Sequence, residues 1–259
     1  MNRFAAAWIA LLLALTGFAP HAAQAQEASL TPDRPGIGDG SAVMAPGQFQ
    51  VETGYRFVDG SGVDQHDIGE LLLRYGVVPG LELRAALNSF VAQIGAGSAD
   101  DESGLSDAGV GLKLSLVRGD GRPMGRPNLS LVASTTLPTG SDAFSSDVAQ
   151  PTVKVAYDWP LSNAVAFSAN AGYTFDTGDA VDGAVDVTAT LGAGLPAAPG
   201  LGVYAGYAGS FTTGPDVSFV EGGLTYLLHP NTQLDLNGAV GVSDAVDDFF
   251  IGAGLAHRF

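Results

Sequence analysis

The residue types that most often carry enzyme chemistry occur in this sequence, but their spacing does not assemble a reactive site. There is no cysteine, and the four histidines do not have the spacing of metal ligands: His21, His66, His229 and His257. The Gly-rich stretches 36–42 and 95–100 lack the lysine of a phosphate-binding loop, and no G-x-S-x-G nucleophile motif is present. We therefore expect no catalytic residues, no metal site, no cofactor and no enzyme activity.

A second set of polar residues is arranged regularly, because acids and bases alternate with apolar residues along extended segments. These charges fall on one face of their segments: Glu52, Arg56, Glu70, Arg74, Glu82, Arg84, Lys113 and Lys154, followed by Asp158, Asp186, Glu221, Asp235 and Arg258. The first eight are candidate binding residues. Opposite charges on neighbouring strands can form an ion-pair network that stiffens an interior, or a charged constriction that selects solutes. Both roles stay open at this point.

The elements that must position these charges are β-strands, because period-two alternation dominates from Gly47 onward. In GQFQVETGYRF, for example, Phe49 and Val51 share one face, while Glu52 and Arg56 share the other. Most segments are about 10 residues long, the length at which a tilted strand crosses a bilayer. Twelve are expected: 48–57, 67–76, 81–90, 107–117, 128–138, 152–159, 164–175, 184–195, 201–211, 217–228, 232–242 and 249–259.

Two further patterns favour a membrane barrel over a soluble sheet. Aromatic residues fall at the two strand ends, as in the girdles of transmembrane barrels: Phe57, Phe90, Phe175, Phe211, Phe219 and Phe249 at one end, and Phe49, Tyr75, Trp159, Tyr226 and Phe259 at the other. Five connections are short: 77–80, 118–127, 160–163, 196–200 and 229–231. The other six hold 15 acids and no Lys or Arg: 58–67, 91–106, 139–150, 176–183, 212–216 and 243–248.

These patterns predict an all-β fold: an antiparallel, up-and-down transmembrane β-barrel of about 12 strands over residues 47–259. Short turns are expected on the periplasmic side and longer acidic loops outside. The closing residues GAGLAHRF (252–259) continue the alternation, so the last strand is expected to pair with the first and leave no edge in lipid. A soluble exported β-sandwich is the alternative fold, since its dry inner face would also exclude charge.

The first 46 residues do not follow this alternation. Arg3, the apolar run 4–15 and the small residues 23–25 predict a secretory signal peptide over residues 1–25. Residues 26–46 contain several Pro and Gly residues together with Asp33 and Arg34. This segment is interpreted either as a periplasmic lead-in whose charges cap a turn, or as a lumen plug in which Asp33 and Arg34 are the candidate contacts.

Residues 30–55, LTPDRPGIGDGSAVMAPGQFQVETGY, resemble the start of a known family. A DRP element and a polar linker precede P-G-x-x-Q-x-E-x-G-Y, and further matches are LLLRYGVVPGLELR (71–84), SDAGVGLK (106–113) and LSLVASTTLPTG (129–140). In this order of motifs the chain is similar to the family labelled "putative MetA-pathway of phenol degradation". The resemblance implies a Gram-negative outer-membrane, transporter-like barrel that passes small apolar or aromatic compounds. It maps no functional residue onto this sequence.

The expected function is passive passage of small, aromatic or apolar compounds through a channel in the Gram-negative outer membrane. The alternative is a structural or adhesive surface barrel without transport. Expected partners are outer-membrane lipid and lipopolysaccharide, a small-molecule solute, and the barrel-assembly machinery through Phe259. Divalent cations at Asp100, Asp101 and Glu102 or at Asp247-Asp248 are a further hypothesis. The net charge of −16 opposes nucleic-acid binding.

Overall fold

The structure is a computed structural model that describes residues 30–60, 62–95, 101–178, 183–243, 246 and 249–259. The predicted signal peptide, residues 1–25, lies outside this part of the chain. All regular elements among the described residues are β-strands. Within the same residues, no helix is long and apolar enough to cross a membrane.

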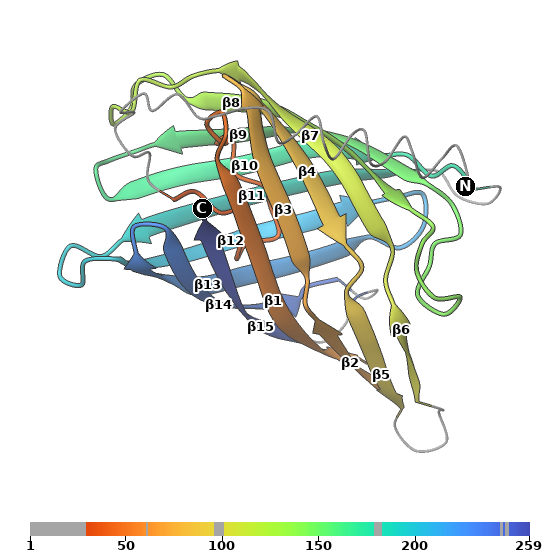
Figure 1. Ribbon diagram of the computed structural model, residues 1–259. Coiled ribbons are helices and arrows are strands. Elements are labelled where there is room, and N and C mark those ends of the chain that lie inside the picture. The colour runs from red at the N-terminus through yellow and green to blue at the C-terminus, as the bar shows by residue number, and fades with distance from the viewer. Residues whose placement is uncertain (1–29, 61, 96–100, 179–182, 244–245, 247–248) are drawn as a thin grey trace.

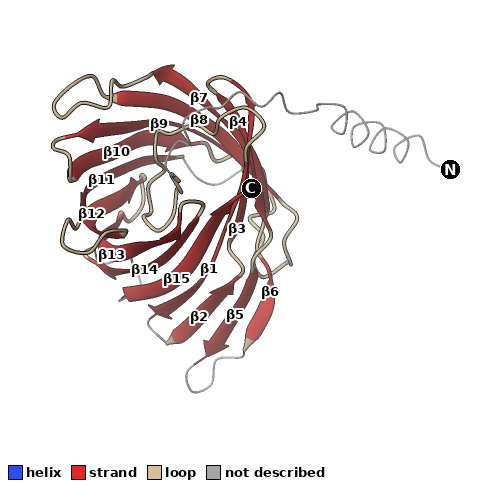
Figure 2. Ribbon diagram, turned by 60° about the vertical axis from the view of Figure 1, so that its left-hand side comes forward, coloured by secondary structure: helices blue, strands red, loops and turns tan. Residues whose placement is uncertain are grey.

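The strands form one antiparallel sheet that closes on itself (Figure 2). β15 pairs with β1 from Gln50↔Arg258 to Asp59↔Phe249, so neither strand presents a free edge there. The strands are β1 (Phe49–Gly60), β2 (Val63–Ile68), β3 (Leu71–Val78), β4 (Leu81–Leu87), β5 (Phe90–Gly95), β6 (Glu102–Leu105), β7 (Ala108–Val117), β8 (Asn128–Leu137), β9 (Gln150–Pro160), β10 (Val165–Thr174), β11 (Ala184–Gly194), β12 (Leu201–Phe211), β13 (Val217–His229), β14 (Thr232–Gly241) and β15 (Phe249–Arg258).

Three of the barrel strands are interrupted side by side. β2 and β3 are halves of one strand, because β3 pairs with the first half of β1 and β2 with the second half. β4 and β5 make the next strand, and β6 and β7 the one after it, with breaks at 69–70, 88–89 and 106–107. Counted in this way, the 15 segments are 12 barrel strands. The predicted fold class is therefore confirmed.

Two segments predicted as external loops, 58–67 and 91–106, are instead largely strand. β1 runs to Gly60, β2 starts at Val63, and β5 pairs with β6 from Phe90↔Leu105 to Gln93↔Glu102. Figure 1 shows β2, β5 and β6 projecting as a ribbon beyond the body of the barrel. The prediction was wrong because it required every strand to show an alternating apolar face. Backbone ladder hydrogen bonds hold a strand without such a face.

Polarity is inverted relative to a soluble protein, which excludes the β-sandwich alternative. The largest fully buried side chains are polar: Arg74, Lys113, Gln50, Glu52, Glu82 and Ser130. Large apolar side chains point outward, for example Leu83, Leu191 and Ile251, each at least half exposed at 50%, 53% and 55%. A soluble sandwich would bury these side chains between its sheets. A transmembrane barrel presents them to lipid and keeps its polar side chains inside.

Most of the predicted aromatic residues lie at strand ends, but Phe90 lies at the break between β4 and β5, in the middle of a barrel strand, and Phe219 lies inside the barrel. Phe49 and Phe259 lie close together at one end, with their ring centroids 5.8 Å apart. Phe219, which was predicted to belong to the outer girdle, instead lies inside the barrel, where its ring is 5.8 Å from that of Phe250. It shares strand parity with the inward Glu221, and side chains two residues apart on a strand point to the same face.

Candidate functional site

The segment 30–46 runs through the interior of the barrel before Gly47 leads into β1 (Figure 1). It forms no strand, so its backbone N–H groups need other partners. Inward side chains supply them: the N–H of Met44 donates to Glu82 at 2.9 Å, that of Ser41 to Asp158 at 2.6 Å, and that of Ile37 to Glu221 at 3.1 Å. Residues from strands around the barrel therefore hold the segment.

The centre of the site is a buried ion-pair cluster on β1, β3 and β4. The Arg74 guanidinium lies 2.9 Å from the Glu52 carboxylate and 2.8 Å from that of Glu82, and all three side chains are fully buried. Arg74 also donates to the backbone carbonyls of Thr31 and Ala42, at 2.9 and 3.0 Å. Burial of these charges is costly unless they are paired and hydrogen-bonded, and this cluster meets both conditions.

Asp33 joins the segment to this cluster. Its carboxylate lies 2.9 Å from the Lys113 ammonium, 2.9 Å from the Arg84 guanidinium and 3.6 Å from Arg74. It also accepts the N–H of Gly40 at 3.0 Å. Burial raises the pKa of Asp33, but the three cations outweigh that effect and hold the pKa below its ordinary value. Asp33 is therefore a charged anchor.

Two further segment residues make ion pairs at separate points of the wall. The Arg34 guanidinium lies 3.1 Å from Glu70 and 3.3 Å from Asp235. The Asp39 carboxylate lies 2.7 Å from both Arg84 and Lys154. Burial raises the pKa of Asp39, and these two cations lower it further than burial raises it. The segment therefore has three charged anchors: Asp33, Arg34 and Asp39.

Each of the ten residues singled out from the sequence, the eight candidate binding residues together with Asp33 and Arg34, has an ion-pair partner in the structure. Arg56 pairs with Asp67 at 2.8 Å and with Glu70 at 3.2 Å, and Glu70 connects it to Arg34. The sequence analysis missed Asp39, which contributes as many pairs to the wall as Arg34 does. A signal for Asp39 was present, because Asp33 and Asp39 are the only acids in residues 30–46, opposite a wall containing four inward-facing cations: Arg74, Arg84, Lys113 and Lys154.

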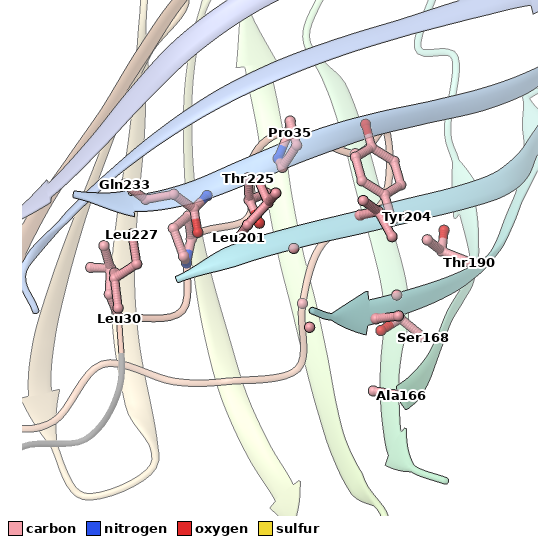
Figure 3. Close-up of a pocket in the computed structure, with 18 of the residues that line it drawn as sticks. Leu30, Pro35, Ala166, Ser168, Thr190, Leu201, Tyr204, Thr225, Leu227 and Gln233 are labelled. Carbon is pink, nitrogen blue, oxygen red and sulfur yellow. The ribbon is translucent and has the colours of Figure 1, made fainter. Parts of the chain in front are cut away.

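Two cavities flank the segment. The larger, about 850 Å³, lies against β10–β14 and reaches the short-turn end of the barrel (Figure 3). The second, about 510 Å³, lies toward the opposite end and is bordered by Arg56 and Phe219. Asn170 and Thr188 line both cavities. The cavities therefore meet where the segment approaches β10 and β11.

Gly38 is the point of closest approach between the segment and that wall. A Cβ atom built at Gly38 would lie 2.6 Å from Thr188 Oγ1 and 3.1 Å from Asn170 Oδ1, so a larger residue would have to move one of them. Next to it, the Asp39 N–H donates to Asn170 Oδ1 at 2.6 Å, and Asn170 Nδ2 donates to the Asp39 carbonyl at 2.8 Å. These contacts form the boundary between the two cavities.

The described residues include no group of three or more His, Cys, Asp or Glu that could hold a metal ion. Of the residues named in the divalent-cation hypothesis, Asp100, Asp247 and Asp248 lie outside the described part of the chain. Asp101 accepts the N–H of Gly95 at 3.1 Å. The hypothesis stays a prediction.

A family model described as "Putative MetA-pathway of phenol degradation" matches residues 32–259. The chain belongs to this family. The described fold and the family therefore agree with the resemblance noted in the sequence. None of the curated proteins matches the chain.

Solved structures similar to this family member are outer-membrane channels and porins. The COG4313 outer membrane channel from Pseudomonas putida F1 matches with a TM-score of 0.68 and 15% identity, over 87% of this chain and 100% of that one. The NanC porin matches with a TM-score of 0.55 and 13% identity, over 82% and 100%. The KdgM porin in complex with oligogalacturonate matches with a TM-score of 0.54 and 10% identity, over 81% and 99%. At these identities the likeness establishes the fold.

Proposed function

We propose that the protein is a passive channel of the Gram-negative outer membrane for small organic compounds, with residues 30–46 as a partial plug. The observation that carries the proposal is the pair of cavities inside one closed barrel, which meet at Gly38 and Thr188. A solute entering from either end reaches this boundary without crossing the ion-pair cluster. The family match supports apolar or aromatic solutes as the class.

The two sides of the plug differ in how firmly they are held. On the side of β1, β3, β4 and β7, buried ion pairs anchor Asp33 to Arg74, Arg84 and Lys113. Beside β10 and β11, by contrast, the segment is held by neutral hydrogen bonds such as those between Asp39 and Asn170, whereas Asp235 and Glu221 hold it on β14 and β13. Buried paired charges are costly to separate, whereas a neutral hydrogen bond contributes only about 0.5–1.5 kcal/mol. Solutes therefore pass beside β10 and β11, where displacing the segment costs least.

The test is single-channel conductance in planar bilayers for the mature chain and for a variant that lacks residues 26–46. We expect the deletion to raise the conductance, because the two cavities then become one lumen. Heat-modifiable gel mobility of both proteins confirms that each is folded. A conductance equal in both proteins would contradict the plug. Two folded, inserted proteins that both stay silent would contradict the channel and favour the structural or adhesive barrel.

The remaining partners are proposals of the same kind. Outer-membrane lipid would cover the apolar belt, and lipopolysaccharide would face the acidic external segments. The barrel-assembly machinery would bind Phe259, whose side chain is well exposed beside His257. Export through the predicted signal peptide and the outer-membrane location would be checked together, by sucrose-gradient fractionation of cells that express the full chain.

A further inference from the structure

The larger cavity has the features of a ligand site in its own right. We propose that it binds uncharged organic molecules that carry hydroxyl groups on an apolar body. This inference rests on the proposed function, because it names the solute class that the channel takes up at this point. The cavity of about 850 Å³ falls within the usual range of small-molecule sites.

The cavity exists because glycines occupy inward positions where other strands carry side chains. A Cβ built at Gly192 would meet no atom closer than the Val203 carbonyl oxygen at 3.9 Å, and one built at Gly194 would meet nothing within 4 Å. Both glycines line the cavity from β11. The space is therefore open at two adjacent inward positions, and a side chain introduced at either one would enter it.

The lining combines apolar surface with hydroxyl and amide groups (Figure 3). Its apolar part includes Leu30, Pro35, Leu201 and Leu227, and its polar part includes Ser168, Thr190, Tyr204, Thr225 and Gln233. Tyr204 Oη and Gln233 Nε2 are shielded from water and have no hydrogen-bond partner among the described residues. Buried polar groups nearly always have a partner. Either group would gain a partner when its side chain turns toward a hydroxyl-bearing ligand in the cavity.

Charge is almost absent from this lining, and that decides the ligand class. Only Asp33 and Asp39 among the lining residues are charged at neutral pH, and their carboxylates pair with Lys113, Arg84 and Lys154 on the opposite wall. Neither of these paired carboxylates offers a charged ligand a free counter-charge, so such a ligand would lose its hydration without compensation from the lining, which weakens its binding. An uncharged ligand with hydroxyl groups would lose little.

The experiment compares three probes of one shape and different charge: benzyl alcohol, benzoate and benzylammonium at pH 7. Binding to the full mature chain in lipid nanodiscs is measured by saturation-transfer NMR. We expect benzyl alcohol to bind at least about tenfold more tightly than either ion, because the ions lose hydration without compensation. Equal affinity for the three probes would overturn the proposal.

A matched pair of variants localises the binding. Gly192→Phe places a ring in the cavity, and Ala189→Phe places the same ring on the exposed outer face of β11. We expect Gly192→Phe to lower benzyl alcohol binding at least about fivefold and Ala189→Phe to leave it unchanged, since a filled cavity has no room for the probe. Partition of the probe into lipid is the same for both variants and cancels in the comparison.

Each outcome separates this inference from the proposed channel. If Gly192→Phe does not show the heat-modifiable gel mobility of a folded barrel, it is replaced by Gly194→Leu, which fills the same cavity. Undiminished binding in the folded variant overturns the site. Conductance is recorded for the same proteins: a conducting wild type without binding defeats this inference alone. Binding to a protein that never conducts defeats the proposed channel and leaves the site in place.

Discussion

Arg74 shows at the scale of a single residue how a charge is kept inside this barrel. Its side chain is fully buried, yet it meets Glu52, Glu82 and Asp33 together with two backbone carbonyls of the segment. Removing one partner from a buried ion-pair network leaves the others unpaired, which costs far more than the network itself contributes.

Arg74→Met is therefore expected to lower the free energy of unfolding by about 3–5 kcal/mol, because it leaves buried carboxylates without a counter-charge. The measurement is urea unfolding of the refolded barrel in detergent, followed by tryptophan fluorescence. Arg118→Met, in an exposed turn, is the control and should change stability by no more than about 0.5 kcal/mol. Equal stability of Arg74→Met and the wild type would contradict the buried network.

Asp107 holds the connection after β8 from the break between β6 and β7. Its carboxylate accepts the N–H groups of Thr139, Gly140 and Ser146 at 3.0, 2.9 and 2.9 Å, and the hydroxyl groups of Ser145 and Ser146 at 2.8 Å each. Burial raises the pKa of Asp107, but these donors together outweigh that effect and hold the pKa well below the ordinary value. The ionised carboxylate is thus the form that orders this connection.

A depressed pKa gives a definite pH dependence. The contribution of Asp107 is fully present above the ordinary carboxyl pKa of 3.8 and is lost as the pH falls below that value. We expect the amide chemical shifts of Gly140 and Ser146 to stay constant from pH 7 to pH 5 and to titrate only below 3.8. In Asp107→Asn these amides should lose their protection from hydrogen exchange at neutral pH. A titration midpoint at or above 3.8 would contradict this account.

Among the elements, the segment 30–46 is held firmly by charged side chains at Asp33 and weakly by neutral contacts near Gly38. Asp33 is held by buried cations, whereas the stretch around Gly38 touches β10 and β11 through neutral contacts. In the proposed channel, passage between the cavities would require this stretch to leave Thr188 while the charged anchors stay in place.

A disulfide across that contact tests the movement. A Cβ at Gly38 would lie 3.4 Å from the Thr188 Cβ, near the usual separation in disulfides, and the chain has no other cysteine. We expect oxidised Gly38→Cys/Thr188→Cys to conduct several-fold less than the same protein after reduction. The single variants, treated with the same oxidant, are the controls. Identical currents before and after reduction would show that the stretch does not move during conduction.

At the scale of the whole molecule, carboxylates outnumber cations along the interior of the described barrel. The interior acids are Asp33, Asp39, Glu52, Asp67, Glu70, Glu82, Asp158, Asp186, Glu221 and Asp235, against Arg34, Arg56, Arg74, Arg84, Lys113, Lys154 and Arg258. The external segments add further acids and no Lys or Arg. Both features make the electrostatic potential along the barrel interior more negative.

This charge balance predicts that small ions cross the channel with a preference for cations. The measurement is the reversal potential in a tenfold gradient of potassium chloride, where the sign gives the selectivity. Asp186→Asn, which neutralises a carboxylate that lines the second cavity, should reduce the preference. Selectivity for chloride would contradict the prediction.

Much of the fold could be predicted from the sequence because period-two alternation is a local property. Side chains such as Glu52 and Val51 must point to opposite faces of any strand, so the inward and outward sets follow without knowledge of the partner strands. The antiparallel barrel and its 12 strands are confirmed on this basis. The same rule, applied consistently, would have placed Phe219 inside with Glu221.

The position of residues 26–46 could not be predicted, because nothing local determines it. The described part, 30–46, has no alternation, and its hydrogen-bond partners are distant in sequence: Glu52 follows Arg34 by 18 residues, but Asn237 follows Pro35 by 202. Only closure of the barrel brings these groups to one place. Alternation along the chain therefore specifies which side chains face inward, whereas what these side chains bind and where space remains depend on contacts across the closed barrel.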